Sequence, residues 1–284
     1  MKANYITPQE IETLDYSNFV SLVDERNRCS GGLRSISDII VNSRLGKTSR
    51  VLEIGCNTGF ASINLALMSG CFVIGIDTNN NALDLARQYA KKNNLENNIS
   101  FVCEAAENLS FFDETFDLIW VSNVTSFISN KHSAIREYIR VLKTGGTLAI
   151  IPIYYRLNPP ENLVSEISKA IGTKIDINTK EYWHNLFTNI PEISNVSIEL
   201  YYERDFEYLD VSDKINKYII SLLEKPHLDK MSIAQKEAVE KRANYFYYLF
   251  NDNLKYCSYS IMLYKKTRGE KEAELFLTKL VEND

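Results

Sequence analysis

Apolar runs and helical stripes alternate through the first half of the chain. Runs long enough for one strand each occur at residues 51–54, 71–76, 99–103, 116–121 and 147–153. Between them, apolar residues recur with the i, i+3, i+4 spacing of an amphipathic helix, as in residues 82–90. Strands that alternate with helices of this length predict an α/β fold with a doubly wound, mostly parallel sheet and helices on both faces.

The second half of the chain is less regular. It carries predicted helices at residues 163–171 and 179–188, then predicted strands at 196–202 and 258–264, then a last predicted helix at 270–282. The two strands bring the expected sheet to seven. Two further helices, at 212–224 and 231–250, form an insertion at about 205–255 before the last strand. That insertion either caps the site or forms a homodimer surface.

The N-terminal region precedes the first strand and also has a helical pattern. Residues 16–45 predict helices that are interrupted at Ser30-Gly31-Gly32. We expect residues 1–45 to form a helical lid and residues 46–284 to form one domain around a core at 50–155. The glycine pair would act as the hinge of that lid. A solvated charged segment with a simple helix break is the alternative.

Composition narrows the class of protein. The chain has 284 residues, of which 45 % are hydrophobic and 24 % charged, as in ordinary globular proteins. No apolar run approaches the roughly 18 residues of a membrane helix, and MKANYITPQE lacks the apolar core of a secretion signal. We therefore expect a cytoplasmic protein with no membrane partner. The net charge of −5 disfavours a nucleic-acid partner.

Cysteine and histidine usage argue against disulfides and metals. The five cysteines are an odd number and include no CxxC pair, which favours free thiols in a reducing compartment. The three histidines are too few for a histidine-rich metal site. We predict no metal.

The sequence Glu53-Ile54-Gly55-Cys56-Asn57-Thr58-Gly59 lies between a predicted strand and a predicted helix, where open α/β sheets bind ligands. It is neither a dinucleotide fingerprint, because two of three glycines are missing, nor a P-loop, because it lacks Lys followed by Ser or Thr. Its glycines let the backbone approach a bulky group, and the helix that follows can hold a carboxylate at its N-terminus. Asp77 ends the next strand, where a carboxylate accepts both ribose hydroxyls. Together these features suit a ribose attached to an amino acid.

Four segments within residues 50–155 resemble the motifs of class I S-adenosylmethionine-dependent methyltransferases. They are VLEIGCNTGFASINLA, VIGIDTNNNALDLAR, FVCEAAENLSFFDETFDLIW and REYIRVLKTGGTLAII, in the expected order. The resemblance implies a Rossmann-like fold, methyl transfer and S-adenosylmethionine as cofactor.

The resemblance also implies residue roles at the cofactor. Glu53 would hold the amino group, the loop residues Gly55, Cys56, Asn57 and Gly59 would line methionine and adenosine, Asp77 would bind the ribose, and Thr78 would lie along the adenine. Glu104, Ala105 and Ala106 occupy the place where the family often has Asp-Ala near the adenine amino group. Val121 and Ser122 would end the fourth strand beneath the sulfonium.

Residues near the methyl acceptor are predicted less directly, because the cofactor carries the reactivity and no fixed catalytic motif is required. Tyr154 or Tyr155 would hydrogen-bond or stack on the acceptor, with core packing as the alternative, and His184 is a candidate base or else a structural histidine. Arg28 would meet an anionic substrate, and Asn123 would lie at the edge of the acceptor. The leading function is methylation of a small molecule in a biosynthetic pathway. A peptide, protein or RNA methyltransferase and a non-catalytic cofactor-binding module stay open.

Overall fold

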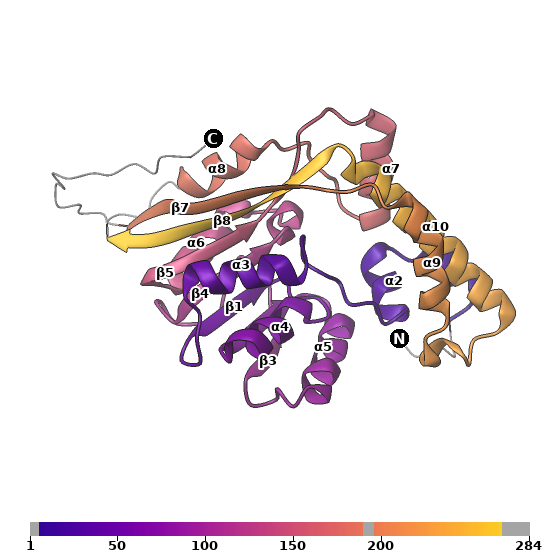
Figure 1. Ribbon diagram of the computed structural model, residues 1–284, viewed down its shortest axis with the longest axis horizontal. Coiled ribbons are helices and arrows are strands. Elements are labelled where there is room, and N and C mark those ends of the chain that lie inside the picture. Colours follow the sequence, from indigo (N-terminus) through magenta and orange to yellow (C-terminus); the bar gives the residue numbers. More distant parts are fainter. Residues whose placement is uncertain (1–5, 190–195, 269–284) are drawn as a thin grey trace.

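The computed structural model describes residues 6–189 and 196–268, and a single twisted sheet runs through it (Figure 1). Its strands are β1 (Arg50–Ile54), β2 (Phe72–Asp77), β3 (Ile99–Cys103), β4 (Phe116–Ser122), β5 (Leu142–Ile151), β6 (Ile153–Tyr155), β7 (Val196–Glu207) and β8 (Cys257–Arg268). The order is β3-β2-β1-β4-β5-β8-β6, with β7 paired to β8. Strands β1 to β5 are parallel, whereas β8 runs antiparallel to its three partners. The predicted α/β fold class is confirmed.

The structure divides the predicted fifth strand at Pro152, so the described sheet has eight strands where the sequence predicted seven. Proline has no N–H to donate to a ladder, and strand pairing breaks at it. Before the break, Thr147 to Ile150 of β5 pair with β8, and after it β6 pairs with the start of β8, with Tyr155 opposite Cys257. The residues that follow Pro152 thereby stay attached to the sheet edge near the site.

Helices cover both faces of the sheet, as the alternating pattern predicted. One face packs against α3 (Leu33–Ser43), α4 (Phe60–Ser69) and α5 (Asn80–Lys92), and the other against α6 (Lys131–Val141) and α8 (Lys180–Thr188). The centres of β1 and β4 are fully buried, which is why these strands read as continuous apolar runs. A short 3-10 turn, η2 (Val124–Phe127), follows β4.

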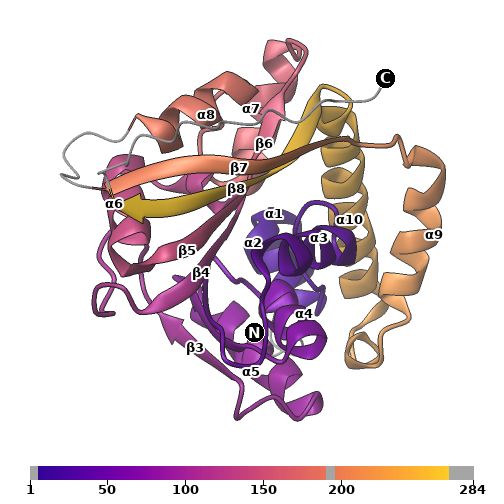
Figure 2. The same ribbon diagram turned by 60° about the vertical axis from the view of Figure 1, so that its left-hand side comes forward.

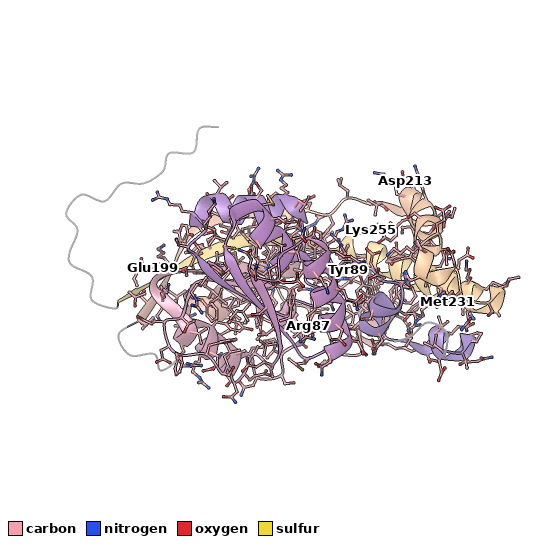
Figure 3. The ribbon with its side chains drawn as sticks, turned by 90° about the horizontal axis from the view of Figure 1, so that it is seen from below. Arg87, Tyr89, Glu199, Asp213, Met231 and Lys255 are labelled. Atoms are coloured by element: carbon pink, nitrogen blue, oxygen red, sulfur yellow. The ribbon has the colours of Figure 1, made fainter. Side chains whose placement is uncertain are left out.

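A third hydrophobic cluster lies beyond the sheet and joins segments that are far apart in sequence. It consists of α1 (Pro8–Thr13), α2 (Tyr16–Leu22), α7 (Glu161–Ile171), α9 (Ser212–Leu223), η3 (Pro226–Leu228) and α10 (Ile233–Leu254), which we call the helical cap. Figure 2 shows α10 standing beside α1, with α9 on the outer side of α10. Figure 3 places Asp213 and Met231 at the cap end of the molecule, opposite Glu199 of β7.

Polar contacts fasten the N-terminal helices to the insertion. The Gln235 side chain donates to the Ile6 carbonyl over 2.6 Å, and Arg242 Nε donates to the Leu14 carbonyl over 2.8 Å. The phenyl ring of Phe246 packs at 5.2 Å, centroid to centroid, from that of Phe19. Helices α1 and α2 of the predicted lid therefore form one helical body with the predicted insertion, whereas α3, in the same predicted segment, packs on the sheet.

Strand β7 continues to Glu207, five residues past the predicted end, and the predicted helix at 270–282 lies outside the described residues. In the described ranges, no helix is both long and apolar enough to cross a membrane.

Candidate functional site

A cavity of about 790 Å³ lies between the carboxyl ends of the parallel strands and the helical cap. Its first end is lined by the residues that follow β1, β2 and β4, together with α2 and the chain at 27–31. Its second end is lined by β6, the C-terminal part of α7, the loop at 173–178, Trp183 of α8 and the end of α10. The ends of the strands position the side chains at the first end of the cavity, and helices of the cap enclose the second end.

Asp77 at the end of β2 presents a fixed carboxylate to the first end of the cavity. The backbone N–H of Asn57 donates to Asp77 Oδ2 over 2.8 Å, and the N–H of Asn79 donates to Oδ1 over 2.9 Å. Each carboxylate oxygen has further lone pairs for a ligand. The side chain is therefore held in place while it can still accept two hydroxyl groups.

Glu53 in β1 is a buried carboxyl group, only 5 % exposed, that also lines the cavity. The Ser62 N–H donates to Glu53 Oε2 over 2.7 Å, and the Ser62 hydroxyl bonds the same oxygen. Burial raises the pKa of Glu53 to about 8 despite these bonds, because ionisation in a poorly solvated place is costly. Within the described residues Glu53 Oε1 has no hydrogen-bond partner, so this atom is free to receive a ligand cation.

The same contact changes one expectation. The sequence placed a ligand carboxylate at the N-terminus of α4, but Ser62 is in the first turn of that helix and its N–H already serves Glu53. One donor of the helix end is thus taken by the protein's own carboxyl group.

Gly55 gives the loop after β1 its close approach to neighbouring elements. It has φ +69°, and a Cβ atom there would lie 2.4 Å from Cγ2 of Val124, a cavity residue. Gly59 has φ +76° and caps α4 without lining the cavity itself. Only glycine adopts such positive φ values without strain while leaving this space open.

The segment that follows α2 crosses the loop after β1 at Thr58. The Asn27 N–H donates to Thr58 Oγ1 over 3.1 Å, and that hydroxyl lies 3.4 Å from the Glu25 carbonyl. Lys225, in the turn between α9 and η3, donates to the carbonyls of Val23 and Asp24. The insertion, the N-terminal segment and the loop after β1 are therefore linked in series.

Adjacent tyrosines in β6 face opposite sides of the sheet, as neighbouring strand residues do. Tyr155 lines the cavity, and its hydroxyl donates to Asn253 Oδ1 over 2.9 Å. Tyr154 lies in the core that contains α6 and α8, with its hydroxyl 3.2 Å from Ser260 Oγ. The strand register thus selects Tyr155, and not Tyr154, as the tyrosine that can meet a ligand.

His184 is directed away from the cavity, and the structure does not support its predicted role as a base. Its Nε2 lies 2.9 Å from Glu203 and its Nδ1 lies 3.3 Å from the Tyr264 hydroxyl, so strands β7 and β8 hold both ring nitrogens. The next residue toward the N-terminus, Trp183, faces the cavity instead, because consecutive helical residues are about 100° apart.

The predicted site residues fall into two groups, those that line the cavity and those that do not. Those that line the cavity are Arg28, Glu53, Gly55, Cys56, Asn57, Asp77, Thr78, Ser122, Asn123 and Tyr155. Those that do not are Gly59, Glu104, Ala105, Ala106, Val121, Tyr154 and His184. Val121 is buried in the core behind β4, and Glu104 follows β3, where its N–H bonds the Asp77 carbonyl over 3.2 Å.

Several lining residues were not singled out from the sequence. They come from α7, α8 and the end of α10, and include Ile167, Ile171, Trp183, Phe250 and Asn253. In sequence, Ile167 and Ile171 are ordinary members of a helical apolar stripe, which does not distinguish a cavity wall from a core.

All five cysteines are free thiols. In the described part, no three His, Cys, Asp or Glu side chains converge on a common point as metal ligands do.

Comparison with known proteins assigns the class. Residues 45–190, just over half of the chain, match the family described as a methyltransferase domain. The chain belongs to this family and is a class I S-adenosylmethionine-dependent methyltransferase, as the four motifs predicted. S-adenosylmethionine is the cofactor of this class, and the predicted cofactor is confirmed.

The relatives are diverse. An uncharacterized protein of Haemophilus influenzae is 30 % identical over 60 % of this chain and 68 % of its own length. Methyltransferase GfsG of Streptomyces halstedii is 35 % identical over 38 % of each chain. Sterol 24-C-methyltransferase ERG6 of Saccharomyces cerevisiae is 34 % identical over 35 % of this chain and 26 % of its own.

Solved structures confirm the fold. The MccD protein has a TM-score of 0.69 and 24 % identity over 85 % of this chain and 100 % of its own. The [4+2]-cyclase SpnF has a TM-score of 0.65 and 18 % identity over 92 % of this chain and 96 % of its own. At these identities the likeness extends to the architecture, and the chemistry must be argued from the site.

Proposed function

We propose that this protein transfers the methyl group of S-adenosylmethionine to a small-molecule acceptor, as a cytoplasmic enzyme of a biosynthetic pathway. The observation that carries the proposal is the two-ended cavity. Its first end holds Glu53 and Asp77 on adjacent strands, and its second end is enclosed by α7, Trp183 and α10. A cavity of about 790 Å³ closed by helices suits a cofactor and a small acceptor better than a folded polymer.

The residues at the first end fit the cofactor. Asp77 accepts the two ribose hydroxyls, since its carboxylate is already oriented by two backbone N–H groups. Glu53 Oε1 accepts from the amino group, and Thr78 follows Asp77 along the adenine. Arg28 is the one cationic side chain among the described lining residues. It meets the methionine carboxylate in place of the N-terminal N–H groups of α4.

Bound S-adenosylmethionine supplies an electrophilic methyl group, and the protein's task is alignment and exclusion of water. In such a transfer, a lone pair of the acceptor would form the bond to the methyl carbon as the carbon–sulfur bond broke, and that electron pair would stay on sulfur. An O–H or N–H acceptor would then lose its proton to solvent. Ser122 and Asn123 at the end of β4 and Tyr155 at β6 border the path between the two ends.

The other candidates have less support. RNA would be favoured by basic side chains at the site, whereas the described lining residues include three acidic side chains and one arginine. The same architecture also occurs in a [4+2]-cyclase, so the fold by itself does not decide the reaction, and the family match supports methyl transfer. The named relatives that act on sterols are methyltransferases of small molecules, which agrees with the proposal.

A labelled-methyl assay tests the proposal. The protein is incubated with methyl-labelled S-adenosylmethionine and, separately, with the small-molecule, RNA and protein fractions of one cell extract. We expect label only in the small-molecule fraction, and at least tenfold less of it with Asp77→Asn when the cofactor is below saturation. Label in the RNA or protein fraction would show that the acceptor is a polymer and would contradict the proposed small-molecule acceptor. Tight cofactor binding without transfer in any fraction would favour the non-catalytic module.

A further inference from the structure

The second end of the cavity has a composition that restricts the acceptor. The side chains that wall it from α7, the loop after α7, α8 and α10 are mostly apolar. Six of the ten are apolar: Ile167, Ile171, Ile175, Trp183, Phe250 and Leu254. The other four are Thr173, Asp176, Asn178 and Asn253. Such a wall favours an apolar body, because the removal of apolar surface from water is the main source of its binding free energy.

The charged groups of the cavity are unfavourable for an anion. Among the described lining residues they are Arg28, Glu53, Asp77 and Asp176, with no lysine and no histidine. Asp176 lines the cavity from the loop after α7. Its ion-pair partner Lys174, on the same loop, is 3.9 Å away and almost fully exposed. A phosphate or sulfonate beside Asp176 would meet a carboxylate whose ion-pair partner lies in solvent, and Arg28 is the one cation among the described lining residues.

One polar pair in the apolar wall is arranged to recognise a hydrogen-bond donor. The Tyr155 hydroxyl uses its hydrogen to bond Asn253 Oδ1, and both side chains are buried. Asn253 Nδ2 in turn lies 3.7 Å from Cys257 Sγ. The Tyr155 oxygen therefore keeps its lone pairs while its single hydrogen is already engaged, so it can only accept.

We infer that the acceptor is an uncharged, mostly apolar small molecule that donates one O–H or N–H group to the Tyr155 hydroxyl. The inference rests on the proposed function, because it assigns the second end of the same cavity to the methyl acceptor. It goes further in excluding anionic acceptors, such as diphosphates and other phosphorylated compounds, and acceptors without a donor group.

Two fluorescent probes test the charge preference. N-phenyl-1-naphthylamine is neutral, apolar and has one N–H group, and 8-anilino-1-naphthalenesulfonate carries the same two ring systems with a sulfonate. In the presence of S-adenosylhomocysteine, we expect the neutral probe to bind at least tenfold more tightly. Equal affinity, or tighter binding of the sulfonate, would overturn the exclusion of anions.

Variants locate the probe. Ile171→Asp should weaken the neutral probe at least tenfold, and Ile171→Trp, which fills the space without a charge, should do the same. Ile220→Asp is the matched control, because Ile220 is 59 % exposed on α9 and lies outside the cavity. Tyr155→Phe should weaken the probe about fivefold by removal of the accepting oxygen. Unchanged binding in both Ile171 variants would overturn the site, and unchanged binding in Tyr155→Phe would overturn the donor requirement.

Cofactor binding, measured by calorimetry on the same variants, separates this inference from the proposed function. We expect Ile171→Asp and Tyr155→Phe to bind S-adenosylhomocysteine as the unmodified protein does, which also shows that they are folded. Loss of probe selectivity with intact cofactor binding contradicts the acceptor class alone. Absent cofactor binding in the unmodified protein, with the Ile171-dependent probe site intact, contradicts the proposed function alone.

Discussion

The Lys225 ammonium donates a 2.8 Å hydrogen bond to the backbone carbonyl of Asp24, which connects the insertion to the N-terminal segment. Lys225 also donates to the Val23 carbonyl over 3.0 Å and lies 3.2 Å from Glu25 Oε2. The carbonyl of Glu25 in turn lies beside Thr58 of the cofactor loop. One lysine of the insertion thus holds the segment that crosses the cofactor end of the cavity.

Lys225→Met should loosen this segment, because methionine keeps much of the aliphatic chain and loses all three polar contacts. We expect faster amide hydrogen exchange at residues 23–28 and a several-fold weaker affinity for S-adenosylhomocysteine. Lys217→Met on the exposed face of α9 is the control and should change neither. If the two variants behave alike, the Lys225 contacts do not restrain the segment.

Asp77→Asn should weaken cofactor binding while the fold persists. The amide keeps the shape but loses the charge and one accepting oxygen, so either the ribose or a backbone N–H loses its partner. Charge-assisted bonds of this kind contribute about 1.5–3 kcal/mol, which predicts at least a tenfold loss in calorimetric affinity. Asp84→Asn, at an exposed pair with Arg87 on α5, should bind normally. Normal affinity in Asp77→Asn would show that the ribose binds elsewhere.

Cofactor binding should release a proton from Glu53. The pKa of Glu53 is raised to about 8 by burial, so the group is mostly protonated at pH 7, and an ammonium beside Oε1 favours its ionised form. Affinity should therefore rise with pH up to about 8. Calorimetry at pH 7 in two buffers of different ionisation enthalpy measures the released proton. Glu53→Gln should bind the cofactor more weakly and release fewer protons on binding. If this variant releases as many protons as the unmodified protein, Glu53 is not the group that ionises.

The same pKa predicts how stability depends on pH. Glu53 titrates at about 8 when folded and near its ordinary value of 4.5 when unfolded, so the folded protein holds the extra proton between these values. Its contribution to the free energy of unfolding is therefore fully present below about pH 4.5 and is lost as pH rises to about 8. The difference between the unmodified protein and Glu53→Gln in urea unfolding should follow this window. A pH-independent difference would contradict the raised pKa.

Gly55→Ala should disturb both stability and cofactor binding. Its Cβ would lie 2.4 Å from Val124 Cγ2, so Val124 must move at a cost of about 1–3 kcal/mol. Gly32→Ala provides the control, because Gly32 has φ +55° but no atom within 4 Å of the new Cβ. The double variant Gly55→Ala/Val124→Ala should recover part of the lost stability beyond the sum of the single changes. Additive effects in urea unfolding would indicate that backbone strain, and not the contact, is responsible.

Local chemistry was sufficient to predict the core of the fold and the first end of the cavity. Strand and helix periods are properties of short segments, so β1 to β4 and the helices between them could be placed from sequence. Glu53, Gly55 and Asp77 were predicted for the same reason, since each occurs at the end of a strand or in the turn that follows it. These residues by themselves indicated only a ligand with a ribose joined to an amino acid. The resemblance to the family identified that ligand as S-adenosylmethionine.

The second end of the cavity depended on contacts between elements that are distant in sequence. Nothing in residues 6–23 or 212–254 shows that they share one hydrophobic cluster, because an amphipathic stripe specifies a buried face but not its partner. The sequence left Tyr154 and Tyr155 both open, and it proposed His184 where Trp183 lines the cavity. Both points had a similar cause. A shift of one residue reverses the face of a strand and rotates a helical side chain by about 100°, and only the tertiary packing sets that orientation.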